Sequence, residues 1–360
     1  MTSSKARIAI IGVGWWSTTA HFPALLANPD ADLVAVCDRS AEALARATAA
    51  FGPIKTYDDY HAMLAAEQLD GVIVATNHTS HYEVAKACLE AGVHVLLEKP
   101  MVLEAAHAHA LVTLAAEKGR ELIVGYPWNY TAITRQARAV MASGKLGAVQ
   151  LVNVHMASMV IEFYRGNDQA YNSIFNYPVT GPGRAYADPK LSGGGQGHLQ
   201  MTHAAGALFF ITGLQADRVS GFMENWEVAV DVIDAINVRF QPANGQTALG
   251  TFSSTGNLGK GDGGQLTISI YCERGYLRLD QAAGTLDVRH HDGAEARYGP
   301  LPPEERYPSA ATSANLVAVA LRQAPNGSPG AMAARVVELL DAAYQSSAQD
   351  GKQIRVADLD

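Results

Sequence analysis

Residues 6–17 read ARIAIIGVGWWS and decide the fold of the N-terminal part of this chain. The run begins as a short, β-branched apolar segment, which is typical of a parallel strand buried on both faces. Gly12-Val13-Gly14 follows at once, and an apolar helical pattern extends from Thr18 to Leu26. A strand, a glycine-rich turn and a helix in this order predict a phosphate-binding unit.

An acidic residue stands where a dinucleotide site needs one. A second apolar run, residues 33–37, ends at Asp38, 24 residues after Gly14. In such a site Gly12 permits the tight turn, Gly14 lets the backbone approach the pyrophosphate, and Asp38 binds the adenosine ribose. The third position of the motif is Ser17 instead of glycine. The flanking strands and the acid favour a dinucleotide site over an ordinary strand–helix turn.

Asp38 and Arg39 bear on which dinucleotide binds. Asp38 repels a 2′-phosphate and favours NAD, whereas the adjacent Arg39 can pair with that phosphate and favour NADP. We expect NAD, with NADP as the alternative. Trp15 and Trp16 follow the turn, and we expect one to cover the cofactor and the other to pack beneath the sheet.

Strands and helices alternate up to Val124, which predicts a doubly wound parallel sheet. Further strands are expected at 71–75, 93–97 and 121–124, and helices at 41–51, 57–66, 82–91 and 104–118. Ligands of such sheets bind at the carboxyl ends of the strands, and three polar clusters fall there. The clusters are residues 12–17, 76–81 and 98–100.

Composition and charge exclude several classes of function. With 48% hydrophobic and 17% charged residues, the 360-residue chain is typical of a folded protein of about two domains. Its net charge is −8 and neither part has a positive excess, which argues against nucleic acid or an anionic membrane as partner. No apolar run reaches the roughly 20 residues of a membrane span, and no signal-peptide pattern opens the chain.

Cysteines and short motifs narrow the chemistry further. Cys37, Cys88 and Cys272 are odd in number and widely spaced, which predicts free thiols and a cytoplasmic location. The sequence contains no Cys-x-x-Cys, no His-Glu-x-x-His and no Gly-x-Ser-x-Gly. We therefore predict neither a metal site nor a nucleophile elbow.

Several motifs together resemble the Gfo/Idh/MocA oxidoreductases. In the N-terminal part they are Gly-x-Gly at 12–14, Ala-Thr-x-x-x-x-His at 75–81 and AGVHVLLEKP at 91–100. A Gly-Gly-Gly…His block at 193–203 and a terminal helix and turn at 343–351 extend the likeness over nearly the whole chain. Because the Glu-Lys-Pro block and the Gly-Gly-Gly…His block occur in one sequence, the resemblance to this family is specific.

The resemblance implies an α/β fold with an N-terminal Rossmann domain and a C-terminal α/β domain on a large open, mostly antiparallel sheet. The predicted division is a dinucleotide-binding domain at 1–125 and a substrate-binding and oligomerisation domain at 126–360. Strand-like runs dominate the second part independently: residues 149–155, 219–224, 234–240, 247–253, 265–272, 275–280 and 285–289. Closing helices are expected at 315–322 and 335–348. The open sheet face implies a homodimer or homotetramer.

The resemblance also assigns catalytic roles by position. In relatives the lysine of Glu-Lys-Pro hydrogen-bonds the reacting hydroxyl and a histidine of the later block is the general base, which points to Lys99 and His203. These types suit the chemistry, because histidine titrates near working pH and an ammonium stabilises a developing alkoxide. We expect a cis bond before Pro100, directing Lys99 inward. Many relatives carry Asp where this chain has Leu199, so their mechanism is not carried over whole.

Further candidates surround these two residues. The cofactor candidates are Gly12, Gly14, Trp15, Trp16, Asp38, Arg39, Thr76, Asn77, His81, Glu98 and Lys99. The substrate candidates are Lys99, Tyr126, Trp128, Asn176, Tyr186, His198, Gln200 and His203. Some come from residues 163–192, a long Gly/Pro-rich aromatic stretch that indicates a sugar-binding loop, a lid or an oligomer contact.

Three functions follow as hypotheses. The first is an NAD(P)-dependent dehydrogenase or reductase that moves a hydride between nicotinamide and a secondary hydroxyl or ketone of a sugar, sugar derivative or cyclitol. The second is a glycoside-cleaving enzyme that uses bound NAD for oxidation, elimination and re-reduction. The third is a non-catalytic dinucleotide sensor. The Lys99/His203 pair favours an enzyme, whereas Leu199 keeps the sensor open.

Overall fold

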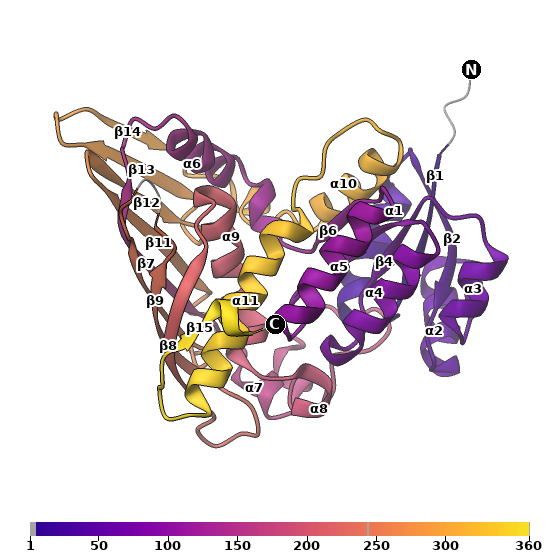
Figure 1. Cartoon of the computed structure of the whole chain (residues 1–360). Helices are drawn as coiled ribbons and strands as arrows, with labels where there is room; N and C mark the ends of the chain where they lie inside the picture. The colour runs from indigo at the N-terminus through magenta and orange to yellow at the C-terminus, as the bar shows by residue number, and fades with distance from the viewer. Residues whose placement is uncertain (1–4, 243–244, 360) are drawn as a thin grey trace.

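The computed structural model describes residues 5–242 and 245–359, which form two sheets with helices between and around them (Figure 1). The N-terminal sheet has six parallel strands in the order β3-β2-β1-β4-β5-β6. The C-terminal sheet has nine strands in the order β14-β13-β12-β11-β7-β10-β9-β8-β15. Only β7 and β10 pair in parallel there. The predicted fold class is confirmed.

The N-terminal sheet consists of short apolar strands covered by helices on both faces. The strands are β1 (Ala6–Ile11), β2 (Ala31–Cys37), β3 (Lys55–Tyr57), β4 (Gly71–Val74), β5 (His94–Leu97) and β6 (Leu122–Val124). The helices are α1 (Phe22–Ala27), α2 (Ala41–Phe51), α3 (Tyr60–Ala66), α4 (His81–Glu90) and α5 (Ala105–Glu117). The helix predicted over 57–66 is wrong at its start, because Tyr57 pairs in β3 and Asp59 caps α3 by accepting from the His61 N–H at 2.7 Å.

The C-terminal sheet is covered by helices on one face. Its strands are β7 (Val149–Ala157), β8 (Ala216–Glu224), β9 (Ile233–Phe240), β10 (Leu249–Thr255), β11 (Gln265–Cys272), β12 (Gly275–Asp280), β13 (Thr285–His290), β14 (Glu295–Tyr298) and β15 (Ile354–Arg355). All seven predicted strands are present, whereas β14 and β15 were not predicted. The helices on its inner face are α6 (Ala132–Ala142), α9 (Thr202–Thr212) and α11 (Gly330–Ser347) (Figure 1).

The outer face of this sheet is open to solvent. Along β9 and β10 exposed and buried residues alternate, so each strand turns one side away from the helices. Large apolar side chains lie exposed on the sheet, with Phe222 at 50% and Leu249 at 55% exposure. Assembly into a dimer or tetramer through this face stays a prediction.

Two helices tie the halves together. Helix α11 lies between the C-terminal sheet and α5, where the Asp341 carboxylate accepts from the Ala105 N–H at 2.9 Å (Figure 1). Helix α10 (Ala310–Ala320) returns to the N-terminal sheet, and its Leu316 joins the core that contains Ile8 and Ile10. The division at residue 125 stays a prediction, with α10 contributing to the N-terminal core from far along the chain.

The structure also describes the cysteines and the lengths of the apolar helices. Cys37, Cys88 and Cys272 are free and buried. Over residues 5–242 and 245–359, no helix combines the length and the apolar character that crossing a membrane requires.

Gly12 lies where the strand order reverses, between the ends of β1 and β4. Its φ is +95°, a region that side chains with a Cβ rarely adopt. A Cβ at this position would also overlap the carbonyl of Ala75, which follows β4. The close approach of the two strand ends therefore requires glycine.

Alanine at Gly12 is expected to lower the free energy of unfolding by at least about 2 kcal/mol, because backbone strain and overlap with Ala75 add. Chemical denaturation measures the change. The matched control is Gly52→Ala, since Gly52 has a φ of +100° but a Cβ there meets no atom within 4 Å. Equal losses in the two variants would mean that overlap with Ala75 contributes nothing.

Candidate active site

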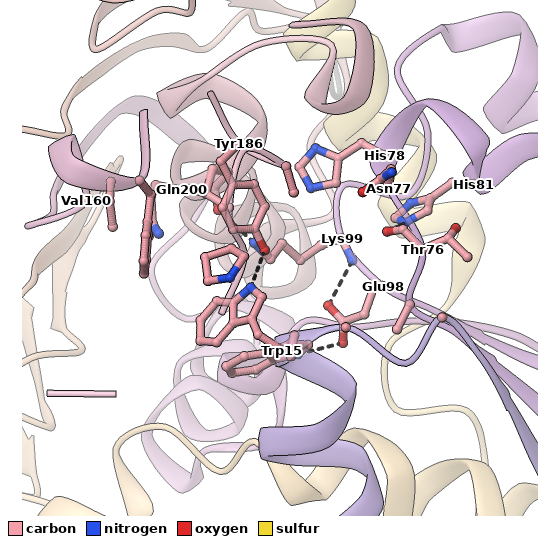
Figure 2. Close-up of a pocket in the computed structure, with 18 of the residues that line it drawn as sticks. Trp15, Thr76, Asn77, His78, His81, Glu98, Lys99, Val160, Tyr186 and Gln200 are labelled. Carbon is pink, nitrogen blue, oxygen red and sulfur yellow. Dashed lines mark hydrogen bonds between the residues drawn. The ribbon is translucent and has the colours of Figure 1, made fainter. Parts of the chain in front are cut away.

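A cavity of about 960 Å³ lies between the carboxyl ends of the N-terminal strands and the inner face of the C-terminal sheet. Residues of all three predicted polar clusters line it. Figure 2 shows Trp15 and Tyr186 on one side of the cavity and Thr76, Asn77 and His81 on the other. Ligands of doubly wound sheets bind at this edge.

The glycine turn at the end of β1 is held by polar contacts of its own. The Ser17 hydroxyl lies 2.7 Å from the Gly12 carbonyl oxygen and 3.1 Å from that of Gly14. Ser17 therefore braces the turn in which the usual motif has a third glycine. The Val13 N–H donates to Asp38 Oδ2 at 2.8 Å, which ties the turn to the end of β2.

This turn fits a dinucleotide phosphate. A Cβ built on Gly14 meets no atom within 4 Å, so the backbone is open on that side. The helix after it begins at Trp15, and the first N–H groups of a helix have no intrahelical acceptor. Such groups bind phosphate oxygens. The turn thus offers both the space and the donors that a pyrophosphate needs.

All the predicted cofactor residues line the cavity: Gly12, Gly14, Trp15, Trp16, Asp38, Arg39, Thr76, Asn77, His81, Glu98 and Lys99. The Asp38 carboxylate is fixed in place, because Oδ1 also accepts from the Ser40 N–H at 2.9 Å. Arg39 is exposed beside it. The expectation that one of Trp15 and Trp16 packs beneath the sheet is wrong, since both line the cavity.

His81 connects two of the polar clusters. Its Nδ1 lies 2.8 Å from the Pro100 carbonyl oxygen and its Nε2 lies 3.2 Å from that of Thr76. Burial lowers the pKa of this imidazole, against hydrogen bonds that raise it. Both ring nitrogens face main-chain carbonyls and the neutral imidazole donates to one of them, so His81 links the loops around the cavity.

Glu98 is buried at the end of β5, and both its carboxylate oxygens are hydrogen-bonded. Oε1 accepts from Trp16 Nε1 at 3.1 Å and from His21 Nε2 at 2.9 Å. Oε2 accepts from the Lys99 main-chain N–H at 3.1 Å (Figure 2). Burial raises the pKa of Glu98, but the contacts with His21 and Lys99 outweigh it, and the pKa is below its ordinary value. Glu98 thus braces the backbone that carries Lys99.

Lys99 reaches from the N-terminal sheet to the C-terminal domain. Its Nζ donates to the Leu199 carbonyl oxygen at 2.9 Å. Burial lowers the pKa of its ammonium to about 8, and the nearby Glu98 carboxylate opposes this. The Lys99–Pro100 peptide bond is cis, as the sequence predicted.

His203 projects from α9 into the same cavity and is 5% exposed. Its ring packs edge-on against Trp128, with centroids 5.3 Å apart, and against Tyr307 at 6.2 Å. Burial, followed by the charge of Lys99, holds the pKa of His203 well below its ordinary range. The imidazole is therefore neutral at pH 7 and can accept a proton.

Leu199, at the position where the resemblance leads us to expect Asp, contributes through its main chain. Its side chain belongs to an apolar cluster with Val160 and Phe163. Its carbonyl accepts from Lys99 within a π turn, Gly197–Met201, that leads into α9. π turns within helices are frequent at functional sites. A main-chain carbonyl therefore provides Lys99 with a polar partner from the position of the absent carboxylate.

The long aromatic stretch closes over the glycine turn. Trp15 Nε1 donates to the Tyr186 hydroxyl at 3.0 Å (Figure 2). The Trp15 ring also packs against Phe175 and Phe163, with centroids 5.6 and 5.7 Å away. Helix α7 (Ile161–Tyr164) leads into this stretch, and α8 (Pro189–Ser192) ends it. It covers the end of the cavity at which the phosphate turn lies.

Three residues predicted to bind substrate do not line the cavity. Tyr126 is buried beneath His203 and shares a hydrogen bond with the Thr202 hydroxyl at 2.9 Å. His198 stacks on Tyr344, with centroids 4.3 Å apart. Asn176 contacts the N-terminal domain through its main chain, because its carbonyl oxygen accepts from the Thr19 hydroxyl at 3.1 Å. The other candidates do line it: Lys99, Trp128, Tyr186, Gln200 and His203.

Sequence reasoning missed several lining residues from the C-terminal part, among them the polar residues Gln281, Arg306 and Tyr307. Gln281 follows β12, whereas Arg306 and Tyr307 belong to the connection between β14 and α10. No motif marks them in the sequence. The return of the chain toward α10 brings Tyr307 beside His203.

Two family models match the chain over most of its length. Residues 6–126 match the GFO/IDH/MocA oxidoreductase family, NAD-binding Rossmann fold, and residues 134–278 match the GFO/IDH/MocA C-terminal domain. The structure is similar to that of an oxidoreductase domain protein from Kribbella flavida, with a TM-score of 0.82, 24% identity and coverage of 98% of this chain and 99% of that one. It is also similar to GenD2 from gentamicin A biosynthesis in complex with NAD, with a TM-score of 0.77, 23% identity and coverage of 99% and 97%. At these identities the likeness shows the fold.

Curated relatives match over shorter segments. D-glucoside 3-dehydrogenase of Escherichia coli (strain K12) is 36% identical over 152 residues, 41% of this chain and 42% of that protein. D-apiose dehydrogenase of Paraburkholderia graminis is 34% identical over 146 residues, 41% of this chain and 39% of that protein. The matched segment thus spans about two fifths of the length of each relative.

Proposed function

Because this chain belongs to the Gfo/Idh/MocA oxidoreductase family, we propose that it is an NAD-dependent sugar dehydrogenase with Lys99 and His203 as its catalytic residues. The observation that carries the proposal is that a cation and a neutral imidazole line one cavity with an open phosphate turn. The two curated relatives are named for activity on D-glucosides and D-apiose, which supports a sugar or sugar derivative as substrate.

In this proposal each side chain has a separate task. NAD, when bound, supplies the hydride acceptor. His203 accepts the proton of the reacting hydroxyl on Nε2, because Nδ1 is buried away from the cavity surface. The Lys99 ammonium stabilises the alkoxide oxygen as the proton leaves. Asp38 binds the adenosine ribose, and the cover formed by Trp15 and Tyr186 excludes water from the phosphate end.

The first test is nicotinamide absorbance with NAD⁺ or NADP⁺ and a panel of sugars, glycosides and cyclitols. Sustained reduction of NAD⁺ in preference to NADP⁺ is expected, because the fixed Asp38 carboxylate disfavours a 2′-phosphate. Protein that binds NAD but neither reduces it nor oxidises NADH with any keto sugar contradicts the proposal. Glycoside cleavage without net reduction of NAD⁺ would instead indicate the redox-neutral glycosidase. The absence of both activities would indicate the dinucleotide sensor. The cytoplasmic location stays a prediction.

The pH dependence of sugar oxidation is expected to have a falling limb near pH 8. Lys99 acts as a cation, and burial lowers its pKa to about 8, so raising the pH through this value removes the stabilising charge. The lowered pKa of His203 places the acid limb well below pH 6.5. Profiles of kcat/KM from about pH 5 to 10 measure both limbs.

The control for this prediction is Lys99→Arg, which keeps its charge throughout that pH range and removes the falling limb. A rate that instead rises through pH 8 in the wild-type protein would mean that neutral Lys99, and not His203, accepts the proton.

A further inference from the structure

A second polar group of residues in the cavity lining, which we call the substrate end, is made by Gln281, Arg306 and Tyr307. The Tyr307 ring lies 6.2 Å from that of His203, so this end adjoins the proposed reaction centre. These residues belong to the C-terminal domain and lie outside the segments matched by the family models. They are available to bind parts of the substrate away from the reacting carbon.

Arg306 is held rigidly at this end. Its Nε donates to the Leu301 carbonyl and its Nη1 to the Ala282 carbonyl, both at 2.9 Å. Its own carbonyl accepts from Trp128 Nε1 at 3.0 Å. Within the described part of the chain, Nη2 has no hydrogen-bond partner. A guanidinium fixed in this way loses little conformational entropy when it binds a ligand.

Gln281 has an unsatisfied acceptor in the same region. The side chain is 1% exposed, and its Nε2 donates to the Thr134 hydroxyl at 2.6 Å. Its Oε1 is buried and has no hydrogen-bond partner among the described residues. A buried acceptor without a donor is unfavourable. A ligand hydroxyl at this end of the cavity would supply the donor.

The charges around the cavity are arranged so that Arg306 lacks a counter-ion. Among the described residues it forms no ion pair with a carboxylate. The acidic residues that line the cavity come from the N-terminal domain: Asp38, Asp58, Glu83 and Glu98. Glu98 is already occupied by Trp16, His21 and the Lys99 N–H. The substrate end therefore offers a cation that no protein carboxylate neutralises.

We propose that Arg306 and Tyr307 bind a carboxylate of the substrate while Gln281 accepts from a neighbouring hydroxyl. The substrates are then acidic sugars, such as uronates, which is a refinement that rests on the proposed function. Arg306 Nη2 and the Tyr307 hydroxyl together supply donors for two carboxylate oxygens. Lys99 and His203 act on a hydroxyl at another carbon of the same sugar.

The experiment compares matched substrate pairs, D-glucuronate with D-glucose and D-galacturonate with D-galactose. In the wild-type protein kcat/KM is expected to favour the acid of each pair. Arg306→Gln is expected to lower the ratio of kcat/KM for the acid to kcat/KM for the neutral sugar by between about 10-fold and 100-fold, chiefly through the KM of the acid. Arg297→Gln is the charge-matched control, because Arg297 lies on β14 outside the cavity lining.

A binding measurement separates this inference from the proposed function. Calorimetric titration of NADH-loaded protein with D-glucuronate forms a complex that cannot turn over. Binding that Arg306→Gln weakens supports the carboxylate site even if no sugar is ever oxidised. Oxidation of neutral sugars, with acids neither bound nor used better, overturns the inference and leaves the proposed function standing.

Tyr307→Phe tests the same site without removing the contacts of Arg306 with Leu301 and Ala282. It is expected to weaken acid binding by about 10-fold, and it keeps the inference testable should Arg306→Gln fail to fold. Unchanged binding of D-glucuronate in a folded Tyr307→Phe protein would remove Tyr307 from the site. A preference for D-glucose 6-phosphate over D-glucuronate would overturn the carboxylate assignment.

Discussion

Lys99→Met is expected to lower kcat for sugar oxidation by between about 10²-fold and 10³-fold while leaving the affinity for NAD within about twofold. Methionine keeps the length of the side chain but removes the charge that stabilises the alkoxide. Steady-state kinetics give the change in kcat, and fluorescence titration with NADH gives the cofactor affinity.

A stability measurement distinguishes a catalytic lysine from a structural one. The Lys99 ammonium is buried enough to lower its pKa to about 8, so an apolar side chain of similar length is expected to leave thermal stability unchanged or to increase it. Lys86→Met is the control, since Lys86 lies on α4 outside the cavity lining. A loss of activity below about tenfold, together with a loss of stability, would show that Lys99 serves mainly to hold the Leu199 carbonyl.

His203→Gln is expected to lower kcat by between about 10²-fold and 10⁴-fold. Glutamine can still hydrogen-bond the substrate but cannot take its proton, so binding survives better than turnover. The measurement is kcat and KM across neutral pH, where the lowered pKa keeps the native imidazole neutral.

The histidine control is His155→Gln, because His155 lies on β7 and its Nδ1 is 2.9 Å from the Ser253 hydroxyl. Full turnover in His203→Gln would contradict the proposed role. The proton would then pass to another titratable group of the cavity lining, such as Lys99 or Tyr307.

Much of the phosphate end of the site could be predicted from the sequence. The glycine turn, Asp38 and the Glu-Lys-Pro block each follow a buried strand, and parallel strands bring their carboxyl ends to one edge. Their placement therefore depends only on local pattern and strand order. The expectation that one of the two tryptophans packs beneath the sheet was wrong, because the environment of Trp16 depends on Glu98, which is 82 residues away and accepts from its indole N–H.

The substrate end could be predicted only in part. His203 was found through its motif. Which of the residues near it face the cavity depends on their position around the helical turn, and His198 faces Tyr344 instead. Tyr126 was predicted to bind substrate and is buried against Thr202. Arg306 and Tyr307 carry no motif, because a connection between elements has no periodicity from which a facing direction can be read.

By itself, the sequence determined the two sheets, the phosphate turn and the residues on which hydride chemistry is proposed to depend. The strands and the turn rest on hydrophobic period and glycine spacing, which act over a few residues, whereas Lys99 and His203 were identified by the resemblance to the Gfo/Idh/MocA oxidoreductases. Only the tertiary structure decided which groups meet across the cavity: Lys99 with the Leu199 carbonyl, and Trp15 with Tyr186. The partners in these contacts lie far apart along the chain, so their meeting follows from how the two sheets and α10 pack and not from any local pattern.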